Sequence, residues 1–265
     1  MGEMKGSIET YRERGKIMNS ILSVVAILAL TGSLAFSPWP APTGNVQVRV
    51  ENGDLIIQGD HRDNNIIVTE GNITGRAATT INGGRQIFPP EGVTGDIVIN
   101  MKGGNDFVRV ELPGTNFAVI HDLEINMGAG NDLLELLQVR VPEETRIDTA
   151  GGHDIILIDG VFKFGEFHSS EFTGKFQVKT DNGEDLLEFH NARFLGPVDI
   201  DLGNGADAAC STEDSEFQMP DQAVFNGGSP SGFPGDGFVA PSTEFTNIIN
   251  FENFPADCSH IGGRF

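Results

Sequence analysis

The side chains best placed for chemistry in this sequence are five aspartates that recur at one position of a repeated eight-residue frame. They are Asp106, Asp132, Asp154, Asp185 and Asp207. Two residues before each aspartate the frame holds a glycine, and these turn glycines are Gly104, Gly130, Gly152, Gly183 and Gly205. Glycine followed closely by aspartate is typical of a tight turn that needs unusual backbone angles. The pattern predicts the same turn five times, each carrying one carboxylate.

Two kinds of chemistry suit a stack of such turns. Neighbouring strands lie about 4.8 Å apart, so the carboxylates would form a column with that spacing. Unit charges this close repel each other by roughly 1 kcal/mol in water, so another interaction must compensate for the repulsion along the column. Successive turns can share Ca²⁺, a hard cation that takes about six to eight oxygen ligands. Alternatively, each carboxylate accepts hydrogen bonds from backbone N–H groups of its own glycine-containing turn. Both alternatives stay open, and the five aspartates are the predicted Ca²⁺ ligands.

The residues on either side of each turn alternate with the period of β-strands. The first frame begins at Ile99; Val93 and Ile97 precede it, and Val108 and Val110 follow it. Comparable pairs flank the other four frames, which indicates strands with one buried face. We predict an all-β fold, a right-handed parallel β-helix of about five regular 22–31-residue rungs with an N-terminal hairpin and a C-terminal cap.

Three of the turns resemble a known repeat. Gly103-Gly-Asn-Asp106, Gly128-Ala-Gly-Asn-Asp132 and Gly151-Gly-His-Asp154 are similar to degenerate RTX, or haemolysin-type, repeats with the pattern G-G-x-G-x-D, which occur in secreted bacterial proteins. The resemblance covers residues 93–211 and implies parallel winding with Ca²⁺ between turns. The chain departs from the pattern because it has one turn per rung, and because Asn182 and Asn204 replace a glycine.

The composition limits the partners that the protein can bind. The chain has 38 acidic and 17 basic residues and a formal net charge of -21. Such acidity argues against nucleic acid and against anionic membrane surfaces. No phosphate-loop pattern is present in the sequence, so no nucleotide cofactor is expected. The expected partners are calcium and an extracellular glycan or protein.

The ends of the chain differ in composition from the repeats. Residues 1–37 predict a signal peptide, or an uncleaved N-terminal anchor, and residues 38–45 predict a proline-rich linker. Residues 46–92 are predicted to form a hairpin and an incomplete first rung, in which Asn65 takes the place of the turn aspartate. The predicted localisation is secreted or cell-surface by bacterial-type export, with the periplasm as an alternative.

Residues 212–265 are rich in Phe, Gly and Pro and predict a C-terminal cap over the last rung. A phenylalanine patch exposed for a partner is the competing interpretation. Cys210 and Cys258 are the only cysteines, and an even pair in a secreted protein predicts a disulfide, here between the last rung and the tail. Closing such a loop contributes roughly 4 kcal/mol on the chain-entropy account.

Three charged residues of the repeat could serve an enzymatic function. Asp148, Lys179 and Asp201 follow the strand before the turn and share one predicted outer face, as a polysaccharide lyase or hydrolase would require. The six histidines are scattered along the sequence, and no hydrolase or metalloprotease motif occurs. The sequence favours a non-enzymatic structural or binding module, with a polysaccharide-active enzyme or an adhesin as alternatives.

Overall fold

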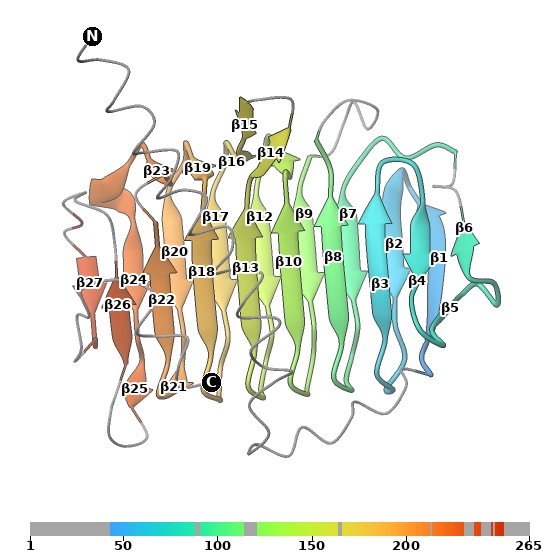
Figure 1. Ribbon diagram of the computed structural model, residues 1–265, viewed down its shortest axis with the longest axis horizontal. Coiled ribbons are helices and arrows are strands. Elements are labelled where there is room, and N and C mark those ends of the chain that lie inside the picture. Colours follow the sequence, from blue (N-terminus) through green and yellow to red (C-terminus); the bar gives the residue numbers. More distant parts are fainter. Residues whose placement is uncertain are drawn as a thin grey trace, which may run out of the picture. The chain divides into compact units, whose positions relative to one another are not determined.

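The computed structural model describes residues 43–87, 91–113, 121–163, 166–212, 214–230, 236–239, 245 and 247–251. The chain divides into two units, Met1–Pro40 and Ala41–Phe265, and all described residues belong to the second. The predicted signal peptide and most of the predicted linker lie outside the described residues. Apart from one short 3₁₀-helix, η1 (Pro220–Gln222), the described elements are β-strands. They stack into long parallel sheets (Figure 1), which confirms the predicted all-β parallel solenoid.

The first side of the solenoid is a ten-stranded sheet in the order β27-β24-β20-β17-β12-β9-β7-β2-β1-β5. The strands are β1 (Asn45–Glu51), β2 (Asp54–Gln58), β5 (Thr80–Ile81), β7 (Ile97–Asn100), β9 (Leu123–Asn126), β12 (Thr145–Asp148), β17 (Phe176–Lys179), β20 (Val198–Asp201), β24 (Val224–Asn226) and β27 (Asn247–Ile249). The β1–β2 pair is antiparallel and forms the predicted N-terminal hairpin. Its turn places Asn52 and Gly53 at positive φ, as an Asn-Gly hairpin turn requires.

The second side is a nine-stranded sheet in the order β26-β22-β18-β13-β10-β8-β3-β4-β6. The strands are β3 (Asn65–Thr69), β4 (Ile73–Gly75), β6 (Gln86–Ile87), β8 (Phe107–Glu111), β10 (Leu133–Leu137), β13 (Ile155–Asp159), β18 (Leu186–His190), β22 (Ala208–Ser211) and β26 (Gly237–Val239). Strand β4 pairs antiparallel with both β3 and β6 and ends this sheet on its N-terminal side.

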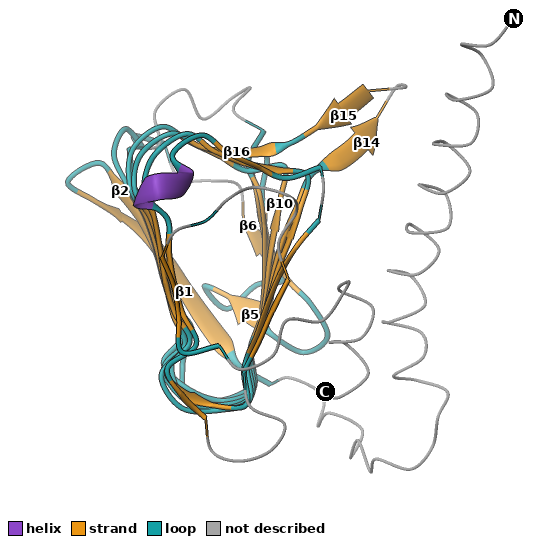
Figure 2. Ribbon diagram, turned by 90° about the vertical axis from the view of Figure 1, so that its left-hand side faces the viewer, coloured by secondary structure: helices purple, strands orange, loops and turns teal. Residues whose placement is uncertain are grey.

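The third side is shorter and follows the corner after the second sheet. It contains β11 (Arg140–Val141), β16 (Ser170–Phe172), β19 (Ala192–Phe194) and β23 (Glu216–Phe217). Figure 2 looks along the stack and shows these sides around a common core. Two small sheets complete the described strands, namely the hairpin β14 (Val161–Lys163) with β15 (Glu166–His168), and β21 (Asn204–Gly205) with β25 (Ser229–Pro230). The β14–β15 hairpin projects from the stack in Figure 2.

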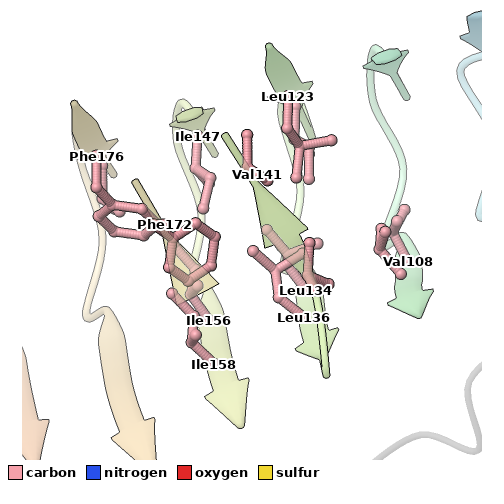
Figure 3. Packing of buried hydrophobic residues seen from close by; sticks show 14 of the residues in the cluster. Val108, Leu123, Leu134, Leu136, Val141, Ile147, Ile156, Ile158, Phe172 and Phe176 are labelled. Atoms are coloured by element: carbon pink, nitrogen blue, oxygen red, sulfur yellow. The ribbon is translucent and has the colours of Figure 1, made fainter. Parts of the chain in front are cut away.

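Residue alternation explains why these segments become strands around one core. In β8, β10 and β13 every second side chain is buried and its neighbours face outward. Figure 3 shows Leu134, Leu136, Ile156 and Ile158 pointing from β10 and β13 into this core. Burying a side chain of this size stabilises the fold by roughly 1.5–3 kcal/mol. The apolar side chains of each rung pack against those of the two neighbouring rungs.

The core changes from aliphatic to aromatic along the stack. From β16 onward, phenylalanine rings contact one another, beginning with Phe172 and Phe194 at a centroid distance of 5.3 Å. Phe217, Phe225 and Phe238 continue this aromatic contact and are buried. Parallel pairing also continues past Ser211, through β23, β24 and β26. The described part of the predicted cap therefore adds strands to the same sheets, and these three phenylalanines face the core rather than a partner.

Candidate functional site: the stacked turns

The turns between the first and second sheets stack closely because they contain glycine. Gly103, Ala129, Gly151, Asn182 and Asn204 form a row of parallel β-bridges through the five turns. Gly152 has φ +148°, and a Cβ on it would collide with the carbonyl oxygen of Gly130. At each of the other four predicted turn glycines, an added Cβ would likewise collide with the backbone of the preceding turn. Glycine at this position permits the close backbone approach that the stack needs.

The five predicted aspartates form one buried column, which we call the inner ladder. Each carboxylate oxygen Oδ1 accepts a hydrogen bond from the backbone N–H of the equivalent residue in the preceding rung. The donor and acceptor pairs are Asp106 N to Asp132 Oδ1 (2.7 Å), Asp132 N to Asp154 Oδ1 (2.9 Å), Asp154 N to Asp185 Oδ1 (2.8 Å) and Asp185 N to Asp207 Oδ1 (2.9 Å). The side chains are 0–3% exposed. The carboxylates thus accept backbone N–H bonds, but the donors belong to the preceding rung and not, as the sequence predicted, to each aspartate's own turn.

The inner ladder is longer than the sequence frame indicated. At its start, the backbone N–H and the side-chain Nδ2 of Asn64 donate to Asp106 Oδ1 at 2.7 and 3.0 Å. The prediction that Asn65 takes this place was wrong by one residue, because Asn65 is the strand residue that pairs with Phe107. At its end, Asp207 N donates to Asp236 Oδ1 at 2.9 Å. Asn64 and Asp236 thus extend the column by one position in each direction.

The second carboxylate oxygen of each inner-ladder aspartate has a different environment. The Oδ2 atoms of Asp106, Asp132, Asp154, Asp185 and Asp207 are buried without a hydrogen-bond partner. Burial disfavours the charged carboxylate and raises the pKa to about 7 for Asp106, about 8 for Asp132, about 6 for Asp154, about 7 for Asp185 and about 8 for Asp207. Bonds from backbone N–H groups partly offset this rise in pKa, as do the side chains of Thr149 at Asp154 and of Thr180 at Asp185. The ladder therefore holds protons near neutral pH in the absence of a bound cation.

The residues just before the first four of these aspartates, together with Asp63 before Asn64, form a second column, which we call the outer ladder. Here the backbone N–H of a later rung donates to the side chain of the rung before it. The bonds are Asn105 N to Asp63 Oδ1 (2.8 Å), Asn131 N to Asn105 Oδ1 (2.8 Å), His153 N to Asn131 Oδ1 (3.0 Å) and Glu184 N to His153 Nδ1 (3.0 Å). These side chains are half-buried or exposed.

A metal centre requires several ligands that converge on one point. No group of three or more His, Cys, Asp or Glu side chains within the described ranges is arranged to hold a metal ion. One oxygen of each inner-ladder aspartate is already used by a backbone N–H. The atoms left for a cation are the buried Oδ2 atoms, one in each rung. The fit to Ca²⁺, which needs about six to eight oxygens, therefore depends on Oδ2 atoms of several rungs and on backbone carbonyls.

A third acidic column lies outside the solenoid, at the corner before the first sheet. Asp96 N donates to Asp54 Oδ1, Asp122 N to Asp96 Oδ1 and Glu144 N to Asp122 Oδ1, at 2.9, 3.1 and 2.7 Å. A small surface pocket there is lined by Asp96, Asp122, Leu123, Glu124, Glu144 and Arg146. The repeated frame did not indicate this column, because its members lie at or just before the start of the first-sheet strands, outside the eight residues of the frame. The signal for it was an acidic residue three positions before each of the first three frames.

The structure brings the predicted enzymatic residues into one row on the outer face of the first sheet. Asp148 pairs with Lys179, and Lys179 pairs with Asp201, on three neighbouring strands. The ammonium group of Lys179 forms an ion pair with Asp181. This exposed pair and the carboxylates of Asp148 and Asp201 raise the pKa of Lys179 further above its usual value. A lysine held as a cation in this way is a poor proton acceptor.

A histidine cluster that the sequence did not indicate lies on the outer face of the second sheet. His190 Nε2 is 3.2 Å from Glu188 Oε2, and the His190 side chain is 15% exposed. Asp159 is its register neighbour on the adjacent strand. Burial opposes a charged imidazole, yet the hydrogen bond to Glu188 and the charges of Glu188, Asp159 and Asp214 raise the pKa of His190 overall. Burial also raises the pKa of Asp159 to about 6. Asp159 and His190 come together only because their strands stack, and they are far apart in the sequence.

Cys210, on β22, is 1% exposed and is not a free thiol. Cys258 lies outside the described residues, so the Cys210–Cys258 disulfide stays a prediction. No helix in the described ranges is long and apolar enough to cross a membrane. No protein-family model, curated protein or solved structure matches this chain. The resemblance to RTX repeats therefore stays a prediction from the turn residues.

Proposed function

We propose that the protein is a secreted or cell-surface structural and binding module without enzymatic activity. One observation carries this proposal. The chemically distinctive residues of the repeat, its aspartates and glycines, are used in bonds and close approaches between rungs. Because these residues hold neighbouring rungs together, we assign them a structural role, and the outer sides of the solenoid carry acidic residues. The predicted export signal and the net charge of -21 support a role outside the cytoplasm, where cations and glycans are the expected partners.

Calcium is the cation that we propose for the inner ladder. The buried Oδ2 atoms without partners support this proposal, because a cation beside them would supply the missing interaction. Binding to the folded state alone raises stability by RT ln(1 + [L]/Kd). A site with a Kd of about 10 μM, saturated at 1 mM Ca²⁺, would add about 2.7 kcal/mol.

The test is thermal unfolding of the full chain in EDTA and in 1 mM Ca²⁺, beside the double variant Asp132→Asn/Asp154→Asn. Calcium binding predicts an upward shift that the variant loses. Mg²⁺ at the same concentration controls for general screening of the negative charge, because its smaller octahedral shell does not suit a flexible oxygen site. Equal melting in EDTA and Ca²⁺ would rule out the calcium proposal and leave the ladder as a structural device.

A polysaccharide-active enzyme is the second candidate. The observation in its favour is the His190, Glu188 and Asp159 cluster, since neighbouring titratable groups with shifted pKa values are typical of proton-transfer sites. Release of reducing ends or unsaturated products from a panel of neutral and acidic polysaccharides would reveal such activity. An enzyme would lose it in Asp159→Asn and His190→Gln but keep it in Asp148→Asn. Absence of product with every polysaccharide supports the binding module.

A further inference from the structure

Five asparagine residues in this chain are each followed by a glycine, and this pair of residues can rearrange without a catalyst. They are Asn52, Asn82, Asn182, Asn204 and Asn226. In the rearrangement the backbone nitrogen of the glycine attacks Cγ of the asparagine, and the side-chain NH2 leaves as ammonia with the proton of that nitrogen. Water then opens the resulting succinimide at either carbonyl and gives aspartate or isoaspartate. Because glycine has no Cβ, its nitrogen is unhindered.

The last three of these pairs lie in or beside the stacked turns, where hydrogen bonds restrain them. Gly183 N donates to Asn204 O at 2.9 Å, so the nitrogen that would attack Asn182 is engaged. Gly227 N is likewise engaged, because it donates to Ile249 O at 2.9 Å. The side-chain Nδ2 of Asn204 donates to Asn182 Oδ1 at 3.0 Å. The stack therefore restrains each of these pairs.

The pair Asn82–Gly83 is exposed, but its asparagine side chain is held against β1. Val48 N donates to Asn82 Oδ1 at 2.8 Å, and Asn82 Nδ2 donates to Val48 O at 2.9 Å. These bonds fix both polar atoms of the side-chain amide. Both must break before Cγ of Asn82 can turn towards the nitrogen of Gly83.

The pair in the β1–β2 turn has the least restraint. Asn52 is exposed, and its side chain forms no hydrogen bond with another described residue. The carbonyl oxygen of Gly53 accepts bonds from Thr94 N at 2.9 Å and from Gly95 N at 3.1 Å, and these bonds do not engage the N–H of Gly53. Ring closure requires this turn to leave its left-handed backbone, in which Asn52 has φ +56°, and such local opening costs less than opening of the stack.

We propose that Asn52 is a site of spontaneous modification, which converts to aspartate and isoaspartate while the other four Asn-Gly pairs persist. The fold selects this site, because the sequence offers the same glycine nitrogen at every pair. The reaction consumes only water and releases ammonia. The proposal concerns the hairpin at the N-terminal end of the stack and is independent of calcium binding and of any enzymatic activity.

Formation of isoaspartate loosens the N-terminal hairpin. In isoaspartate the main chain runs through Cβ and Cγ, which lengthens the backbone of the turn. The pairing of Glu51 with Asp54, which closes the hairpin, depends on the geometry of this turn. The bonds from Thr94 and Gly95 to Gly53 O join the same turn to the segment before β7. A longer backbone disturbs both.

The test is peptide mapping by mass spectrometry after incubation of the full chain in a mildly alkaline buffer. We expect deamidation at Asn52 to be at least about tenfold faster than at Asn82, because two hydrogen bonds restrain the second side chain. The products at Asn52 should include isoaspartate, which has the mass of aspartate and a different chromatographic retention. Equal rates at the two sites, or an unmodified Asn52, would overturn the proposal.

The same incubation in urea is the control for the role of the fold. The hydrogen bonds of Asn82 are absent in the unfolded chain, so we expect the rates at Asn52 and Asn82 to become similar. A preference for Asn52 that persists in urea would show that the local sequence selects the site, against the proposal.

Thermal unfolding tests the effect on the hairpin. Ion exchange separates the isoaspartate form of the chain, and Asn52→Asp is the matched control because it carries the same new charge on a normal backbone. We expect the isoaspartate form to melt at a lower temperature than Asn52→Asp. Equal melting temperatures would show that the turn accommodates the longer backbone, and would overturn the loosening of the hairpin.

Discussion

The inner and outer ladders are built from adjacent residues of the same turns, and they differ in direction, burial and composition. Inner-ladder side chains accept from the rung before, whereas outer-ladder side chains accept from the rung after. The five regular rungs use only aspartate in the buried ladder, while the exposed ladder uses Asp63, Asn105, Asn131 and His153 as acceptors. Water can replace an acceptor at the surface but not in the interior. The same kind of hydrogen bond therefore restricts the choice of residue only where solvent is excluded.

Removing the close approach of the turns should break both ladders at once and have the largest effect. In Gly152→Ala the new Cβ would collide with Gly130 O at a φ that alanine avoids. We expect a loss of at least about 4 kcal/mol in the free energy of unfolding, or failure to fold, measured by urea denaturation. Gly151→Ala is the matched control, because its Cβ would lie 3.5 Å from Asn182 O, and it should cost about 1 kcal/mol or less. Equal losses would contradict the role of the close approach.

The pH dependence of stability should separate the two ladders next. Burial raises the inner-ladder pKa values from 3.8 to about 6–8, so the folded state holds protons that the unfolded chain releases. The stabilisation from these carboxyl groups is complete below pH 3.8 and is lost as pH rises through about 6–8. In EDTA, we expect the free energy of unfolding to fall by several kcal/mol between pH 5 and pH 8.5.

The double variant Asp132→Asn/Asp154→Asn should show a smaller fall over the same range, because two of the titrating groups are gone. Asn131→Ala changes the outer ladder only and should keep the full pH dependence. Stability that rises with pH in the unmodified protein would mean that the inner-ladder carboxylates are charged and compensated in the fold.

Single side-chain truncations should have the smallest effects and still distinguish the ladders. Asp132→Ala removes the acceptor of the buried Asp106 N–H, and we expect a loss of about 2 kcal/mol in thermal or urea unfolding. Asn131→Ala removes the acceptor of His153 N–H, where water is available, and should change stability by no more than about 0.5 kcal/mol. Similar losses in the two variants would remove the distinction between buried and exposed ladders.

The repeated frame predicted much of the fold because turn chemistry and alternation agree in it. Gly152 and Asp154 stand at fixed offsets, and the strands around them alternate, so parallel stacking followed from sequence alone. The rung that ends with Asp236 was missed because its turn departs from the frame. Phe225 to Asp236 spans twelve residues where the frame has eight, and the intervening insertion hides the equivalence. Register with β20 and β22, which only the structure supplies, reveals it.

The candidate sites were less predictable than the fold. The five aspartates were identified from the sequence. Their hydrogen-bond partners were not, because each partner is a backbone N–H group of a neighbouring rung. The Asp54, Asp96 and Asp122 column and the His190 cluster join residues from different rungs, and loops of unequal length separate them. Sequence distance gives no measure of such contacts when the rungs differ in length.

The direction of the inner ladder makes the two edges of the solenoid chemically different. The N–H of Asp154 is satisfied by Asp185 of the next rung, so a rung needs its C-terminal neighbour to complete this bond. A stack interrupted at any rung would leave an unmet backbone donor at its C-terminal edge. In the complete stack, Asp236 accepts the N–H of Asp207.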